Sequence, residues 1–267
     1  SPVGWAEKVE PFGANRVAVV LLGVATLLAG VAIAFALLDR RDLGAGMIAA
    51  RPGRRNASRW LASPEALAFR LARGSMIGWT IGFALFGVIL GSITGSIESM
   101  LDDPKLADLL RSIGGGQGTL TDIYFAAELK EAAVLATGAG IAMMLHARGE
   151  ETAGRAEWLL STPTRRLRWL CSHALVAMLA PVWLLLVLGT LAGLLSNGAA
   201  VPSTGELVTA ALATVPACWA CVGVTWLLVG VAPKRAPLIW AAYAIAFVLA
   251  EFGALLELPD QVVALSP

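Results

Sequence analysis

Charged residues are scarce in this sequence of 267 residues. Asp, Glu, Lys and Arg make up 15% of it, while 57% is hydrophobic and the mean hydropathy is +0.74. A water-soluble domain of this length needs about a quarter of its residues charged to cover its surface. The shortage excludes an ordinary soluble protein, and a net charge of +1 gives no basis for binding nucleic acid.

Cysteine and histidine are also rare, which removes the usual nucleophiles and metal ligands. Cys171, Cys218 and Cys221 lie in apolar runs, so no disulfide framework is predicted. The C-x-x-C spacing of the last two lacks the strand context of a redox motif, and inert buried thiols are the better interpretation. The Gly-rich run at 114–118 lacks the Lys-Ser/Thr of a phosphate loop. We therefore predict no catalytic site, metal site or cofactor in this chain.

Long apolar runs are what the sequence has instead. A hydrocarbon core about 30 Å thick requires about 20 helical residues to cross it. Helices are expected because lipid offers no partner for an unpaired backbone amide. The sequence therefore predicts an all-α integral membrane protein with about six transmembrane helices, at 17–38, 75–97, 123–147, 170–196, 207–233 and 238–256.

Basic residues gather in three of the connecting segments. The ranges 39–74, 148–168 and 232–236 hold fifteen of the twenty Lys and Arg residues, whereas 98–122 is mainly acidic. The positive-inside rule places the basic segments in the cytoplasm and both ends of this chain outside. With an Arg-, Ala- and Leu-rich composition, this predicts a multi-pass protein of a bacterial plasma membrane.

Small residues recur along the second predicted span and allow another helix to approach closely. Two interpretations remain open, packing inside one subunit and a seam between two copies. The stripe consists of Gly78, Gly82, Gly87, Gly91 and Gly95.

Two segments on the basic side carry helix signals of their own. Ser63, Pro64 and Glu65 supply a capping hydroxyl, a first-position proline and a first-turn acid, which predicts a short amphipathic helix at the interface. Residues 149–160 begin with acids, and Pro163 prevents easy continuation. This second segment predicts a compact cytoplasmic helix that docks into a partner's groove. A helix lying on lipid headgroups is the alternative.

The order of residues in this second segment resembles a known family. An acid pair followed by G-R-A-E-W-L-L-S-T-P-T-R-R at 154–166 resembles the coupling region of permeases in the type-2 ABC exporter superfamily. The actinobacterial polyketide-antibiotic (tetronasin-like) multidrug exporters are the most similar. The S-P-V-G-W-A-E-K-V-E-P-F run at 1–12 resembles the external segment before a span in those permeases, and D-R-R-D-L at 39–43 resembles the basic end after it.

The resemblance implies a permease subunit of an ATP-driven exporter that moves amphipathic drug-like or antibiotic molecules out of the cell by alternating access. The implied partners are an ABC ATPase subunit with two nucleotide-binding domains, which would hold ATP and Mg, the other half of the permease, the lipid bilayer and small amphipathic cargo. No nucleic acid is implied. The residues implied for the ATPase-coupling helix are Glu151, Arg155, Glu157, Trp158 and Leu160.

Permeases of this superfamily resemble two fused halves, and this chain resembles a part of such a two-half permease. On this interpretation 1–38 is an external segment with the last span of a first half. Residues 39–74 form a cytoplasmic linker with the amphipathic helix, and 75–267 form five spans of a second transmembrane half.

Acids inside the predicted spans are the remaining clue. A charge at mid-bilayer costs about 2.5–3.5 kcal/mol, so such residues face protein or water. Glu128, Glu131 and Glu251 are predicted to line the outward part of a cargo pathway. Alternatively, the first two cap a helix start and pair with Lys130. A proton-coupled secondary transporter would use all three acids as a relay, and a non-transporting scaffold is a third possibility.

Overall fold

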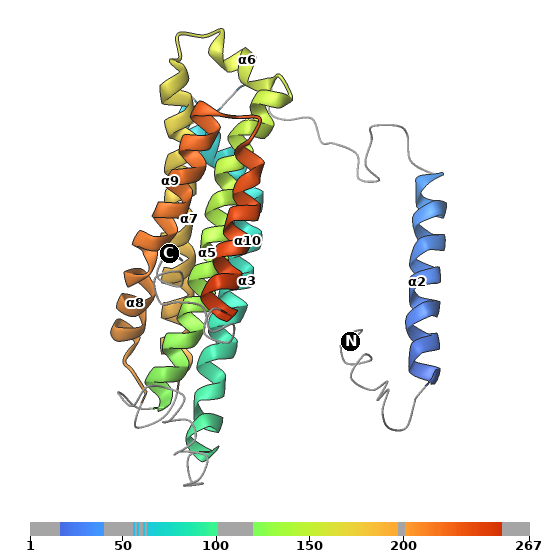
Figure 1. Cartoon of the computed structure of the whole chain (residues 1–267), viewed down its shortest axis with the longest axis vertical. Coiled ribbons are helices and arrows are strands. Elements are labelled where there is room, and N and C mark those ends of the chain that lie inside the picture. The colour runs from blue at the N-terminus through green and yellow to red at the C-terminus, as the bar shows by residue number, and fades with distance from the viewer. Residues whose placement is uncertain are drawn as a thin grey trace. The chain divides into compact units, whose positions relative to one another are not determined.

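The computed structural model describes residues 17–39, 56, 58, 61, 63–100, 120–196 and 201–252. These residues form helices and turns, with no strand among them, which confirms the predicted all-helical class. The chain divides into two units, Ser1–Ala57 and Ser58–Pro267, whose elements are labelled in Figure 1.

The described part of the first unit is one helix, α2 (Val17–Leu38). None of its 22 residues is charged, and none of them is buried. Its bounds coincide with the first predicted span. A helix that is hydrophobic on all sides is suited to an apolar environment, because lipid can contact its whole circumference.

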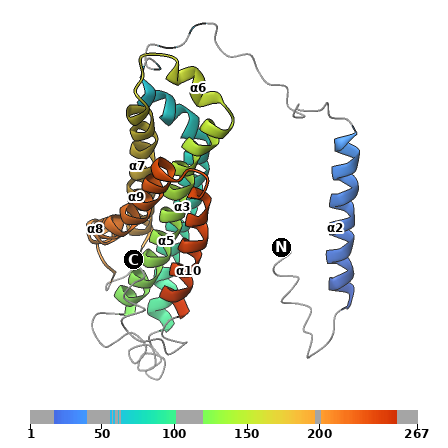
Figure 2. The ribbon, with the colours of Figure 1, turned by 45° about the horizontal axis from the view of Figure 1, so that its top comes forward.

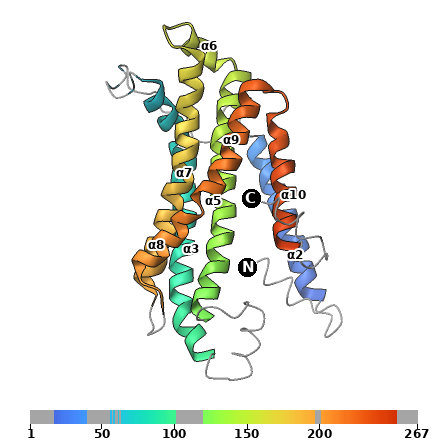
Figure 3. The ribbon, with the colours of Figure 1, turned by 60° about the vertical axis from the view of Figure 1, so that its left-hand side comes forward.

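The second unit is a helical bundle built around α7 (Arg166–Leu195), which packs against α3 (Pro64–Met100), α5 (Leu120–Thr152), α8 (Thr204–Ala213) and α9 (Val215–Val231). Figure 3 shows α7 running along the bundle with α3 and α5 beside it. The remaining elements are α6 (Arg155–Leu160), the 3₁₀ turn η2 (Ala236–Leu238) and α10 (Ile239–Phe252).

The interior of the bundle combines small residues with layers of leucine. Small side chains allow helix backbones to approach closely in a membrane, where packing replaces the hydrophobic effect as the driving force. Alanines of α5 and α7 lie at the helix contacts, and leucines of α7 fill the space between them. The buried residues include Ala132, Ala136, Ala139, Ala177, Ala180, Leu184, Leu185 and Leu188.

Four helical stretches are long and apolar enough to cross a membrane: Val17–Leu38, Pro64–Thr94, Arg166–Leu195 and Thr204–Val231. They correspond to four of the six predicted spans. The other two predicted spans are helical but outside this set. The range 123–147 lies within α5, which carries Glu128, Lys130 and Glu131, and 238–256 overlaps α10, which has only 14 residues.

Two elements differ from the sequence prediction. The amphipathic helix is not separate, because it forms the first turns of α3, which continue into the span. Ser63 Oγ accepts a hydrogen bond from the Ala66 N–H at 3.2 Å, as expected for a cap. Nothing after it breaks the helix, since Gly74 alone costs only about 1 kcal/mol. Figure 2 shows these first turns inclined to the rest of α3.

The predicted span at 207–233 is two helices that meet at Thr214. Pro216 occupies one of the first two positions of α9. Proline has no N–H to continue the hydrogen-bond ladder from α8, but it is well tolerated in a first helical turn. Ser203 and Glu206 form a capping box at the other end of α8.

The glycine stripe of α3 divides into two parts. A Cβ atom at Gly87 would lie 2.7 Å from the Leu188 carbonyl oxygen, and one at Gly91 would lie 2.5 Å from the Ala192 carbonyl oxygen. A Cβ atom at Gly78 or Gly82 would have no neighbouring atom within 4 Å. Packing inside the subunit is therefore confirmed for Gly87 and Gly91, and the surroundings of Gly95 lie outside the described residues.

Replacing Gly91 by Ala should destabilise the bundle by about 1–3 kcal/mol, because the new methyl group would overlap the α7 backbone. The matched change Gly82→Ala should leave stability unchanged or slightly higher, since it meets open space and improves helix propensity. Thermal unfolding of the purified protein measures both. Equal melting temperatures for the two variants would contradict the assigned α3–α7 contact.

Candidate functional site

A short helix follows the end of α5 and is joined to it by a tight turn. Gly154 has φ +72°, in the left-handed region that glycine adopts without strain. The reversal separates α5 from α6 (Arg155–Leu160), which confirms a helix at 155–160. The acids predicted to begin this helix, Glu150 and Glu151, instead belong to the last turn of α5. The glycine turn, which the sequence prediction overlooked, accounts for that difference.

An ion pair fixes α6 to α5 across this turn. Arg155 Nε donates to Glu150 Oε2 at 2.9 Å, and Arg155 Nη2 donates to Glu150 Oε1 at 2.8 Å. Glu150 is only 7% exposed, although the Arg155 side chain is 60% exposed. The hydrogen bond from Arg155 lowers the pKa of Glu150 from its usual value, against the opposing effect of burial. The carboxyl group is therefore ionised at neutral pH.

Two histidines and a tryptophan surround the buried carboxylate. His146 Nε2 lies 3.5 Å from Glu150 Oε1, one helical turn earlier in α5. His173 is buried in α7, with its ring edge-on to Trp169 at a centroid distance of 5.3 Å. Ala156 of α6 is buried in the same hydrophobic cluster as Ala147 of α5 and Trp169 of α7, which places the start of α6 against the ends of both long helices.

Two further links join helices at the same end of the bundle. Arg168 of α7 donates to both carboxylate oxygens of Glu65 in α3, at 2.9 and 3.3 Å. Arg148 of α5 donates to the carbonyl oxygen of Pro233, which follows α9. The basic residues described near this end belong to all three predicted cytoplasmic segments: Arg70, Arg73, Arg148, Arg155, Arg165, Arg166, Arg168, Lys234 and Arg235.

The five predicted coupling residues do not share one exposed face. Trp158 is 82% exposed, and Glu151 and Glu157 are also exposed. Leu160 is partly buried and packs against the hydrophobic core at this end of the bundle. Arg155 and Leu160 therefore anchor α6 to the bundle. Glu151, Glu157 and Trp158 remain available to contact another protein. Sequence spacing alone could not distinguish the two groups.

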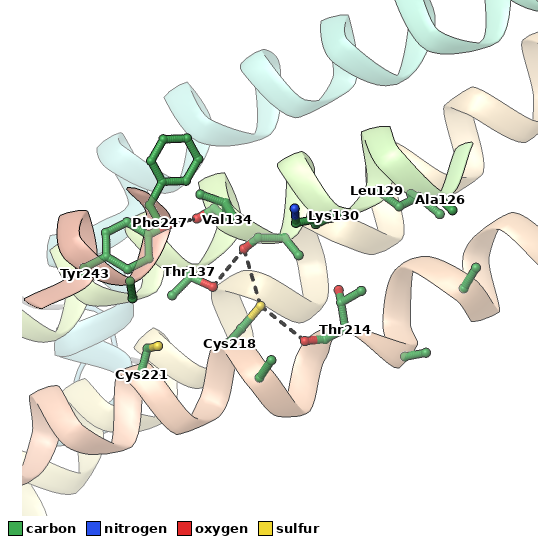
Figure 4. A pocket seen from close by; sticks show the side chains of 15 residues that line it. Ala126, Leu129, Lys130, Val134, Thr137, Thr214, Cys218, Cys221, Tyr243 and Phe247 are labelled. Carbon is green, nitrogen blue, oxygen red and sulfur yellow. Dashed lines mark hydrogen bonds between the residues drawn. The ribbon is translucent and has the colours of Figure 1, made fainter. Parts of the chain in front are cut away.

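An open cavity lies between α5, the α8–α9 pair and α10, and several of its lining residues are exposed. Its volume is about 530 Å³, and it is lined mainly by small and apolar side chains. Figure 4 shows the side chains around it. The polar groups at its wall come from Lys130, Thr137, Thr214, Cys218, Cys221 and Tyr243.

Hydrogen bonds to backbone carbonyl groups hold several of these polar side chains. Thr137 Oγ1 donates to the Ala133 carbonyl oxygen at 2.8 Å, and Cys218 Sγ lies 3.6 Å from the same atom. Tyr243 Oη donates to the carbonyl oxygen of Val134, which ties α10 to α5 (Figure 4). The thiols are half-buried or buried and free, and no disulfide joins them.

A second cavity of about 440 Å³ adjoins the first near the starts of α5 and α8. The two share Ala126, Leu129 and Ala210 as lining residues. Asp122 and Glu206 contribute carboxylates to the second cavity. Glu206 Oε2 accepts hydrogen bonds from the Ser203 N–H and hydroxyl at 2.7 and 2.8 Å, so its position is fixed by the capping box.

The acids predicted for a cargo pathway are not among the residues that line either cavity. Glu128 and Glu131 are half-buried on α5, and the side chain of Glu251 lies outside the described residues. Their proposed role remains a prediction. The sequence prediction missed Lys130, Asp122 and Glu206 as lining residues, although their charges at the ends or inside of apolar runs were a usable signal. No group of three or more His, Cys, Asp or Glu side chains in the described ranges is arranged to hold a metal ion.

Apolar helices of membrane-spanning length, packed through small residues around a cavity of ligand size, define a polytopic membrane protein. A model of the family described as "Multidrug efflux system permease Rv1217c, C-terminal domain" matches residues 61–267. This chain belongs to that family.

A full-length relative supports the same assignment. The multidrug efflux system permease protein Rv1217c of Mycobacterium tuberculosis (strain ATCC 25618 / H37Rv) is 34% identical over 272 residues. The alignment covers 100% of this chain and 49% of the relative, so the chain spans about half the length of the curated relative it matches.

Removing the charge of Glu150 should loosen α6. In Glu150→Gln the bidentate pair with Arg155 is lost, and amide hydrogen exchange at 155–160 should become severalfold faster at neutral pH. Because the pair lowers the pKa of Glu150, its effect is complete at neutral pH and is lost as the pH falls through that lowered pKa.

The neighbouring change Glu151→Gln is the control, because Glu151 is exposed and should leave exchange in α6 unchanged. Equal exchange rates in both variants would show that the Glu150–Arg155 pair does not hold the helix.

Proposed function

We propose that this chain is the C-terminal transmembrane half of the permease in an ATP-driven, type-2 ABC-like exporter of amphipathic drug-like molecules. The family assignment and the coverage of half of a multidrug efflux permease support the proposal. The ATPase, with two nucleotide-binding domains that hold ATP and Mg, would be a partner, and the other half of the permease would complete the pathway.

The proposed topology has six spans: the four that meet the length and hydropathy requirements, together with α5 and α10. A helix of 33 residues is about 50 Å long, enough to cross a 30 Å core and project beyond it, so α5 can span despite its charges. The basic residues gathered at the α6 end support its placement in the cytoplasm. Both ends of this chain would then be outside the cell.

Labelling of single cysteines tests this orientation. A cysteine at Gln117 should react with an impermeant maleimide in intact cells, whereas one at Thr152 should react only after permeabilisation. Labelling of the unmodified protein gives the background signal, since its three native cysteines are buried or half-buried. The reverse pattern would place α6 outside and remove it from contact with any cytoplasmic ATPase.

The exposed Trp158 on an anchored helix is the observation that carries the coupling proposal. A large aromatic side chain that is 82% exposed in this chain is the type of residue that dominates a protein interface. The pairs at Glu150 and Glu65 connect α6 and α7 to α5 and α3. Closure of the ATPase would therefore move α6 and, through the Arg155–Glu150 pair, α5, which lines the cavity.

Trp158→Ala should weaken the ATPase complex by about 2 kcal/mol or more and reduce ATP-driven export, because an aromatic anchor is lost. Trp158→Phe should retain most of both. Trp183→Ala, which removes a half-exposed tryptophan from the middle of α7, should leave ATPase affinity unchanged. Affinity is measured by titration of the ATPase onto the reconstituted permease.

Unaltered affinity and export in Trp158→Ala would contradict docking at α6 and favour a helix that rests on lipid headgroups. Leu160 and Arg155 are poorer test positions, because their replacement would also disturb the anchoring of α6.

A further inference from the structure

We propose that the cavity between α5, α8–α9 and α10 binds a single-chain amphipath with an acidic headgroup, whose carboxylate is held by Lys130. The inference deepens the proposed function by naming the chemical class of one ligand of the permease. It rests on the shape, lining and charge of this cavity.

The cavity has the size and surface of a small-molecule site. Its volume of about 530 Å³ falls in the range of about 300–1,000 Å³ that is usual for such sites. It extends along α5 from Ala126 to Thr137, a distance of about 16 Å at the rise of an α-helix. Alanine side chains form much of the wall, so an unbranched apolar chain could lie along it without a steric conflict. The alanines are Ala126, Ala133, Ala210, Ala213, Ala217 and Ala246.

One lining residue carries a charge. Among the fifteen residues that line the cavity, only Lys130 is charged at neutral pH. Its ammonium group has three N–H donors, which can serve a carboxylate in addition to a partner within the chain. Because attraction between opposite charges is stronger in an apolar surrounding than in water, an acidic headgroup is favoured here and a cationic one is disfavoured.

Lys130 is exposed, so its ammonium group is accessible to a headgroup at the edge of the cavity. Lys130 lies ten residues after Leu120, the first residue of α5, which is about 15 Å along the helix. The apolar chain would then extend along the alanine wall toward Tyr243 and Phe247 of α10. The Tyr243 bond to the Val134 carbonyl group holds α10 as the wall on this side.

The adjoining cavity adds a difference in charge along the path. Its carboxylates, Asp122 and Glu206, lie nearer the starts of α5 and α8, whereas Lys130 lines the first cavity. An acidic headgroup is thus attracted to Lys130 and repelled by the end of the path, which localises the ligand in the first cavity.

Photo-crosslinking in the reconstituted full-length transporter tests the site. The probes are dodecanoic acid and dodecanol, each with a diazirine at its terminal carbon, in bilayers of zwitterionic lipid without ATP. Crosslinks of the acid should map to α5, α9 and α10 residues that line the cavity. Lys130→Gln should reduce them about ten-fold, whereas Lys130→Arg should retain most of them. Crosslinks of the alcohol should be nearly the same in all variants, which shows that the cavity is still folded.

Lys234→Gln is the control for loss of a lysine elsewhere, and it should leave crosslinking by the acid unchanged. Equal labelling of the cavity by acid and alcohol in the native protein, or acid labelling that survives Lys130→Gln, would overturn the proposal. Competition by unlabelled dodecylamine as strong as that by dodecanoate would also overturn it.

A second arm identifies the source of the ligand. Competition by free dodecanoate but not by phosphatidylglycerol in the bilayer would support a single-chain carboxylic acid as the ligand. Equal competition by phosphatidylglycerol, which has two chains and a phosphodiester, would assign the site to an anionic lipid and contradict the proposal. Because the assay needs neither ATP nor export, failure of coupling at α6 would leave this result intact, and failure here would not bear on coupling.

Discussion

Close contact between helix backbones is the constraint on which this bundle depends. At Gly87 and Gly91 the backbone of α3 approaches α7 so closely that a single methyl group would not fit. The same device recurs on the other sides of α7 and α5. A Cβ atom at Gly193 would lie 2.6 Å from Thr204 Cα of α8, and one at Gly140 would lie 2.7 Å from a Val222 methyl group of α9. In lipid, where apolar side chains gain little by leaving the solvent, such contacts supply the packing energy that holds helices together.

The arrangement of charge follows from that packing. Because the long helices lie side by side, their ends meet, and polar groups there can pair across helices rather than within one. Glu65 with Arg168 and Arg148 with the Pro233 carbonyl group are contacts of this kind. The Glu150–Arg155 pair differs, since it closes a turn between successive helices. It holds the six residues of α6 in one position relative to α5. A helix this short would not be stable alone, so its order derives from these contacts.

Hydropathy and length predicted the helices well, because a bilayer imposes a minimum run of apolar residues that few other structures require. The bounds of α2 were predictable in this way, and those of α7 to within four residues, whereas the short helix at 155–160 was indicated by local signals such as the stop at Pro163. Whether Arg155 faces a partner or its own chain was not, since this depends on the left-handed turn at Gly154 and on burial of Glu150. The cavity was equally unpredictable from the sequence. Residues of α5, α8, α9 and α10 that are up to about 120 positions apart line it together, and no local pattern marks them. In the sequence, Lys130 stands out only as a neighbour of Glu128 and Glu131.

The joint at Thr214 has a consequence for the capacity of the cavity. The wall on this side is made by Ala210 and Ala213 before the joint and by Ala217 and Cys218 after it. A change of angle between α8 and α9 would therefore alter the width of the cavity while each helix kept its internal hydrogen bonds. Thr214 Oγ1 already donates to the Ala211 carbonyl oxygen at 2.8 Å, so the interrupted backbone is satisfied locally. A cavity whose wall contains such a joint would change its width by bending at one residue. Breadth of ligand size would then be a mechanical property of the fold, separate from the chemistry by which any one ligand is recognised.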